Sequence, residues 1–169
     1  IKKSYGVSMS GWHNPTAQER LEILKKAKSI AIIGASDNPA RASYFVTTYL
    51  LSSSNYQLYL VNPKLKEILG LPVYPSLAEV PVIPDIVDVF RKAEDLPGVL
   101  DETIAKESKV FWAQLGIFDQ ATADRAQAAG ITAVMDKCIK IEHARFQGGL
   151  NLAGFNTGVI DSRRPNPNL

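Results

Sequence analysis

The chain has 169 residues, 46% of them hydrophobic and 21% charged, so we expect one globular domain with a proper core. Its formal net charge of +2 is too small to indicate a nucleic-acid or membrane-surface partner, and no apolar run approaches the ~20 residues of a membrane span. The single cysteine excludes an intrachain disulfide and favours a reducing, cytoplasmic compartment.

Helical and strand patterns alternate after an irregular beginning. Residues 1–15 show no hydrophobic periodicity, which predicts a loosely held lead-in. Thr16, with Glu19 as its capping-box partner, predicts the start of a helix over 17–27. Short apolar runs predict five strands, at 29–33, 57–61, 86–90, 109–113 and 132–135. Further helices are predicted at 39–51, 76–79, 95–106, 119–129 and from 136 onward.

Two details of these helices follow from local chemistry. Pro39 is expected to start the second helix, because a first turn does not need its missing N–H. The apolar residues of that helix are expected to face inward; they are Phe45, Val46, Tyr49 and Leu50. The tail at 147–169, which is rich in glycine and proline, is expected to be irregular.

Strands that alternate with helices at this spacing predict an α/β fold, with a doubly wound parallel sheet of five or six strands covered on both faces. We expect a single domain over 16–146, flanked by the lead-in and the tail. Ligands of such sheets bind beyond the carboxyl ends of the strands. The functional residues are therefore sought where the strands end.

The stretch 29–43 carries the clearest functional signal. An apolar run ends at Gly34, a short polar loop follows, and then a helical pattern; this order offers backbone N–H groups to a phosphate. The three-glycine fingerprint of NAD sites is absent, because Pro39 stands at the third position. The second strand ends at 62–64 in a lysine and has no carboxylate for a ribose hydroxyl. A lysine at this corner favours a ligand with a phosphate on its ribose, and both NADP and coenzyme A (CoA) carry one.

CoA carries a pyrophosphate and a 3′-phosphate, and cations stand where both would be needed. Ser36, Arg41 and Ser43 are expected at the pyrophosphate and Lys64 at the 3′-phosphate. Plainer interpretations stay open: Gly34 as a tight turn, and Arg41 and Lys64 as solvated cations.

Arg91 directly follows the third strand, so it is better placed than an average surface arginine. It serves either the site or an ion pair with Asp88 or Glu94.

Five segments in this order resemble the small CoA-binding domain proteins, which are similar to the CoA-binding half of the succinyl-CoA synthetase alpha subunit. The segments are 31–36, 60–63, 85–91, 112–117 and 135–143. The resemblance implies a Rossmann-like fold with CoA across the carboxyl edge of the sheet. It implies phosphate contacts from Gly34, Ala35, Ser36 and Arg41. The other contacts that it implies are Asn62, Pro63, Lys64, Phe90, Arg91, Gln114 and Gly116.

Cys138 falls where the resembling synthetases have a cysteine beside the CoA site. We hypothesise that it lies within reach of the CoA thiol and forms a mixed disulfide with it. The alternative is a small side chain that packs beneath the loop.

The synthetases add a domain with a phosphorylated histidine and a second subunit, neither of which we expect from this sequence. His143 is interpreted as a helix-face or interface residue, and no metal-ligating cluster is found. We therefore expect a CoA-binding or acyl-CoA-binding module without complete ligase machinery or independent catalysis. The alternatives are an NADP-dependent or other nucleotide-cofactor enzyme, and a scaffold whose tail forms an oligomer. A homo-oligomer or a partner enzyme stays open.

Overall fold

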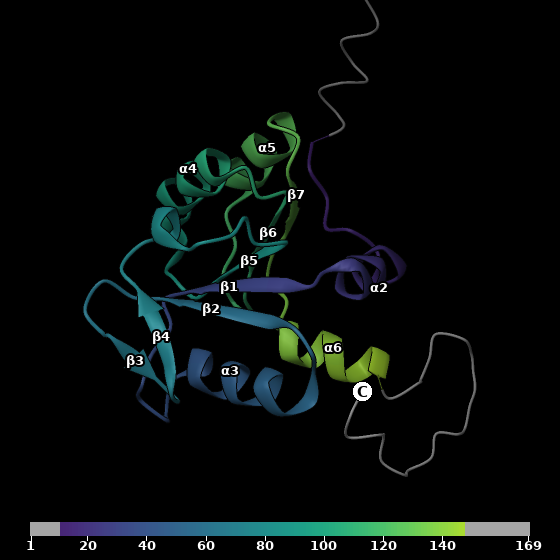
Figure 1. Cartoon of the computed structure of the whole chain (residues 1–169). Helices are drawn as coiled ribbons and strands as arrows, with labels where there is room; N and C mark the ends of the chain where they lie inside the picture. Colours follow the sequence, from purple (N-terminus) through teal and green to yellow (C-terminus); the bar gives the residue numbers. More distant parts are fainter. Residues whose placement is uncertain (1–10, 148–169) are drawn as a thin grey trace, which may run out of the picture.

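The computed structural model describes residues 11–147, and within them seven strands form one sheet (Figure 1). The order is β3-β4-β2-β1-β5-β6-β7, and every neighbouring pair is parallel except β3 with β4. The strands are β1 (Ser29–Ile33), β2 (Gln57–Val61), β3 (Glu67–Ile68), β4 (Leu71–Tyr74), β5 (Ile86–Val89), β6 (Val110–Ala113) and β7 (Thr132–Val134). The predicted α/β fold with a doubly wound parallel sheet is confirmed.

The sheet has one strand more than the predicted maximum because β3 and β4 form a short hairpin at its edge. Leu69 and Gly70 connect them, with φ of 52° and 78°. Two adjacent positive φ angles are what a two-residue hairpin turn requires. Because β3 has only two residues, hydrophobic alternation cannot reveal it.

Helices cover both faces of the sheet (Figure 1). α4 (Leu96–Lys106) and α5 (Gln120–Ala128) lie on one face. α2 (Ala17–Lys26), α3 (Ala42–Ser53) and α6 (Ile139–Gln147) lie on the other. Short 3-10 turns are η1 (Leu77–Glu79) and η2 (Ala93–Asp95). None of the helices in the described part of the chain combines the length and apolarity needed to span a membrane.

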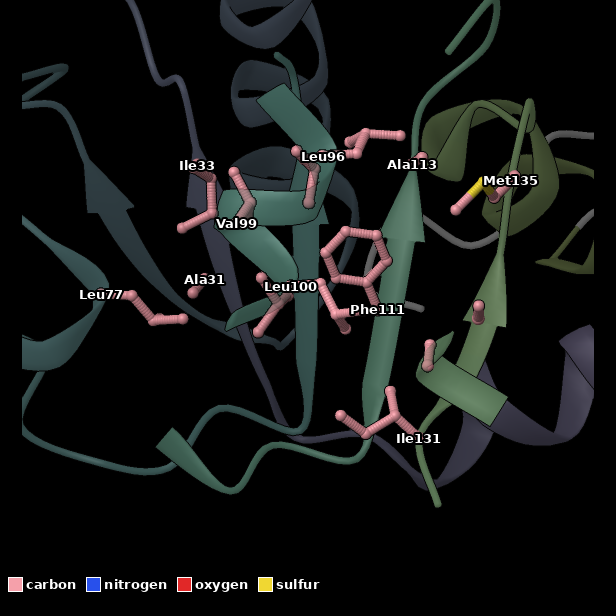
Figure 2. Close-up of a cluster of buried hydrophobic side chains, with 14 of the residues drawn as sticks. Ala31, Ile33, Leu77, Leu96, Val99, Leu100, Phe111, Ala113, Ile131 and Met135 are labelled. Atoms are coloured by element: carbon pink, nitrogen blue, oxygen red, sulfur yellow. The ribbon is translucent and has the colours of Figure 1, made fainter. Parts of the chain in front are cut away.

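The core beneath α4 and α5 is built around Phe111 of β6, which is fully buried (Figure 2). Leu96 and Leu100 of α4 and Met135, which follows β7, belong to the same buried cluster around it. Burying side chains of this size contributes roughly 1.5–3 kcal/mol each. This cluster fixes one face of the sheet and therefore the positions of the strand ends.

The lead-in is irregular but not loosely held over residues 11–15. Trp12 is buried in the same core, and its indole Nε1–H donates to the Ala133 carbonyl at 2.8 Å. Asn14 exchanges hydrogen bonds with the backbone of Met135, at 2.8 Å and 2.9 Å. The expectation was wrong here because a single tryptophan anchors a segment without any periodic pattern. Of the tail expected at 147–169, Gln147 is the last residue of a helix, and residues 148–169, like residues 1–10, lie outside the described residues.

The inward face of α3 differs in one residue from the prediction. Val46 and Leu50 are buried, and Tyr49 is partly buried, as expected. Phe45 is 58% exposed, so the expectation that it faces inward was wrong. The buried stripe includes Ser43 and Thr47 instead, because they share the helical spacing of Val46 and Leu50.

A buried ion pair joins α2 to α6. Arg20 Nε donates to Glu142 Oε1 at 2.7 Å, and Arg145 approaches the other oxygen of Glu142 at 3.4 Å. The expected capping box of Thr16 and Glu19 is present at the start of α2. The Arg20–Glu142 ion pair holds α2 against α6 on the face of the sheet that also carries α3.

Candidate functional site

A cavity of about 500 Å³ lies at the carboxyl ends of β1, β2, β5 and β6. β2 pairs with one edge of β1 and β5 with the other, so the chain reverses its direction of winding there. Ligands of doubly wound sheets bind at this switch point. The lining residues are Gly34, Ala35, Ser36, Arg41, Ala42, Ser43, Asn62, Phe90, Arg91, Lys92, Gln114, Leu115 and Ile117.

Gly34 is required by the backbone geometry at the centre of this edge. Its φ is 89°, and a Cβ built on it would lie 2.6 Å from the Phe90 carbonyl oxygen. The N–H groups of Gly34 and Ala35 both donate to the Val61 carbonyl, at 3.1 Å and 3.2 Å. The end of β1 is thereby held tightly between β2 and β5.

The loop after β1 delays the start of α3. Ser36 Oγ accepts from the Asn38 N–H at 3.0 Å, and Asn38 Oδ1 accepts from the Ala40 N–H at 2.9 Å. The helix therefore starts at Ala42, not at Pro39 as expected. Short polar side chains compete with helix formation in this way.

The N-terminus of α3 carries no side-chain cap. Arg41 occupies the N-cap position without a capping hydrogen bond, and the first turn contains no acidic residue. Unpaired N–H groups and the helix dipole favour an anion at such an end. Arg41 and the buried Ser43 both line the cavity here, so this corner suits a phosphate.

Asn62 ties the end of β2 to the loop after β1. Its Nδ2 donates to the Ala35 carbonyl at 2.8 Å, and its Oδ1 accepts from the Lys64 N–H at 2.7 Å. The side chain thus shapes the cavity wall by holding two segments together. Pro63 and Lys64 are exposed and do not line the cavity.

Two cations follow β5 at the next corner. Arg91 Nη2 lies 3.3 Å from Asp95 Oδ2, and Lys92 Nζ lies 3.8 Å from Glu94 Oε2. The ion-pair partner of Arg91 is therefore Asp95, and neither of the two expected carboxylates. Exposed pairs of this kind contribute little stability, roughly 0–1 kcal/mol, so a ligand phosphate can compete for both cations.

The loop after β6 forms the last wall. Gln114 Nε2 donates to the Lys137 carbonyl at 3.0 Å, which fixes its side chain beneath the cavity. Leu115 and Ile117 line the cavity, whereas Gly116 between them does not. Gly116 has a φ of 83°, and its N–H donates to Asp136 Oδ1 at 2.6 Å.

Cys138 and His143 lie outside the cavity lining. Cys138 is partly buried against the core cluster beneath α3 and α6. His143 is buried on α6, where its Nδ1 shares a hydrogen bond of 2.8 Å with the Tyr49 hydroxyl. Burial lowers the pKa of His143, which favours the neutral ring. Its environment is that of a packed helix-face histidine.

Asp88 is the unusual residue beneath the site. It is fully buried on β5, and within residues 11–147 neither carboxyl oxygen has a hydrogen-bond partner. Strand alternation places it on the same face as Ile86 and Phe90, the latter at the cavity. Burial raises the pKa of this carboxyl well above its ordinary value, so the protonated form is favoured.

The cavity thus brings together nine of the thirteen residues expected from the sequence. They are Gly34, Ala35, Ser36, Arg41, Ser43, Asn62, Phe90, Arg91 and Gln114. Pro63, Lys64, Gly116 and Cys138 do not line it. Sequence reasoning missed Ala42, Lys92, Leu115 and Ile117. Each of these four is a direct neighbour of an expected residue, which is the signal that could have found it.

Comparison with known proteins identifies the family of the chain. Residues 28–144 match the family described as "CoA binding domain". The chain belongs to this family. The uncharacterized protein YneT of Bacillus subtilis is 40% identical over 131 residues, which are 78% of this chain and 96% of that protein. A hypothetical protein from Pyrococcus horikoshii OT3 has a similar structure, with a TM-score of 0.74 and 36% identity over 78% of this chain and 92% of that one.

Some CoA ligases are also similar to this chain, at lower sequence identity. The ADP-forming acetate–CoA ligase I of Archaeoglobus fulgidus is 33% identical over 87 residues, which are 52% of this chain. The aligned part is only 13% of that ligase. The similarity therefore covers one portion of a much larger enzyme.

Proposed function

We propose that the chain binds CoA or acyl-CoA in the cavity at the carboxyl edge of the sheet, as a CoA-binding module. The observation that carries this proposal is the charge of the wall. Arg41, Arg91 and Lys92 line the cavity, and the described part of the chain contributes no carboxylate to the lining. Three cations around an open cavity suit a ligand with several phosphate charges.

The uncapped N-terminus of α3 gives the pyrophosphate a place in this cavity. The Gly34–Ser36 loop and Arg41 flank the same helix end, and Ser43 contributes a hydroxyl. Lys64 is exposed beyond the β2 end and is assigned the 3′-phosphate of a ligand that extends past the lining. Membership of the CoA-binding-domain family and the similarity to acetate–CoA ligases support CoA as this ligand.

Cys138 lies outside the cavity lining, but its neighbour Lys137 accepts a hydrogen bond from Gln114 at the β6 corner. The proposed contact with the CoA thiol therefore requires the pantetheine arm to extend past this corner. Mass spectrometry of protein oxidised in the presence of CoA tests this. A CoA adduct at Cys138 supports the contact, and its absence removes Cys138 from the site.

A thermal-shift panel of CoA, dephospho-CoA and NADP tests the proposed function. A ligand at 100 times its Kd stabilises the folded state by roughly 2.7 kcal/mol. We expect a clear shift with CoA and a smaller one with dephospho-CoA at equal concentration. A shift with NADP and none with CoA would instead identify a nucleotide-cofactor enzyme.

Arg41→Ala is expected to raise the Kd for CoA by about 10- to 100-fold, because a charge-assisted hydrogen bond contributes roughly 1.5–3 kcal/mol. Lys64→Ala is expected to weaken CoA but not dephospho-CoA. Lys109→Ala is the matched control, since Lys109 is an exposed cation that precedes β6 at the opposite end of the strand. Titration calorimetry measures all three. Equal Kd values for Arg41→Ala and Lys109→Ala would show that Arg41 is a solvated bystander.

A further inference from the structure

The loop after β6 exposes large apolar side chains at the cavity wall. Leu115 is 63% exposed and lines the cavity together with Ile117. Phe118 follows directly but does not line the cavity; its ring centroid lies 6.0 Å from that of Trp12. Single exposed apolar residues are common, but apolar residues gathered at one wall of a cavity are typical of ligand contacts.

Hydrogen bonds hold this loop in place, so Leu115 does not reach solvent through a loose conformation. The N–H groups of Gln114 and Ile117 donate to the Val89 and Gln114 carbonyls, at 3.2 Å and 2.9 Å. Asp136 accepts from the Gly116 N–H through Oδ1 and donates its own N–H to the Ile117 carbonyl at 3.1 Å. The loop therefore presents Leu115 from a fixed position.

The cavity has two chemically different ends. Hydroxyls and all three lining cations lie at the β1, α3 and β5 corners, together with Phe90. The β6 corner carries no charge and contributes Gln114 beside Leu115 and Ile117. The order of the strands puts β5 between β1 and β6, so the apolar end lies farthest from the N-terminus of α3. A ligand that places its phosphates at α3 and spans the edge of the sheet ends at Leu115.

We propose that Leu115 and Ile117, in the loop after β6, bind the apolar acyl group of a CoA thioester, so that the protein prefers thioesters with an aliphatic acyl chain to free CoA. This inference rests on the proposed function. It adds the chemical class of the acyl group, which the cationic part of the wall does not determine. Leu115 is then a specificity-determining residue.

Titration calorimetry with CoA, acetyl-CoA and octanoyl-CoA tests this inference. Each buried CH₂ strengthens binding by roughly fourfold when fully covered, so partial covering of an octanoyl chain predicts about tenfold tighter binding than CoA. Acetyl-CoA is expected to bind like CoA. Leu115→Ser is expected to reduce the octanoyl preference to about one, and Leu115→Met to retain it.

Ile83→Ser is the matched control, because Ile83 is 55% exposed and precedes β5 at the edge away from the cavity. It is expected to keep the tenfold preference. Circular dichroism verifies that each variant is folded. Equal Kd values for CoA and octanoyl-CoA in the unmodified protein would overturn this inference and leave the proposed function standing. A preference that survives Leu115→Ser would also overturn it. Binding of none of the three compounds would contradict the proposed function itself.

Discussion

Gly34→Ala is expected to lower the free energy of unfolding by about 3 kcal/mol and to abolish the thermal shift with CoA. A Cβ at this position meets the Phe90 carbonyl oxygen at 2.6 Å, and the φ of 89° is unfavourable for any L side chain. Backbone oxygen cannot rotate away as a flexible side chain does. Relief therefore requires β1 and β5 to separate at the cavity. Urea denaturation measures the loss of stability, and a thermal-shift assay with and without CoA measures the loss of binding.

Gly70→Ala is the matched control for this substitution. Gly70 has a φ of 78°, but a Cβ there has no neighbour within 4 Å. It is expected to cost only about 1 kcal/mol and to leave the CoA shift intact. Equal destabilisation by the two substitutions would show that the contact with Phe90 carries no weight.

Asp88→Val is expected to raise the free energy of unfolding by about 2 kcal/mol at pH 7, because it removes a buried carboxyl without a hydrogen-bond partner. The pKa of Asp88 in the folded state lies well above its ordinary value of 3.8. As the pH rises, the carboxyl of Asp88 therefore loses its proton at a lower pH in the unfolded chain than in the folded protein. Stability that the protonated form provides is present below pH 3.8 and is lost as the pH rises toward the folded-state pKa.

The gain from Asp88→Val should thus be small at pH 4 and large at pH 7. Asp88→Asn separates ionisation from packing, since it keeps the shape and a polar group but cannot ionise. It should remove the pH dependence and give a smaller gain. Urea denaturation of the three proteins at both pH values measures this. A gain that is independent of pH would contradict an ionisation cost at Asp88.

The arrangement of the sheet could be predicted because its central strands are mostly apolar runs separated by helical patterns. The strands at 29–33 and 57–61 agree with β1 and β2, since buried parallel strands read as continuous apolar runs. β3 and Trp12 could not be predicted in the same way. β3 depends on a turn whose first residue, Leu69, has a positive φ. A leucine gives no sequence signal for that conformation, which is typical of glycine and asparagine. Trp12 is placed by a long-range contact with Ala133.

The site could be predicted to the corner of each strand but not to the individual side chain. Strand ends locate Gly34, Arg91 and Gln114 because parallel strands all finish at one edge. Which neighbour faces the cavity depends on the turn that follows. Lys64 turns outward after the Asn62 side chain binds its N–H. Leu115 faces the cavity because the Gly116 turn places it there.

Amide chemical-shift mapping of the isotope-labelled protein during a CoA titration tests the central claim most directly. The account predicts that the largest saturable changes fall on the N–H groups of 34–36, 41–43, 91–92 and 114–117, all at the carboxyl edge of the sheet. Small changes are expected on α6 around His143. Saturable changes centred away from this edge, or no change at millimolar CoA, would contradict the account.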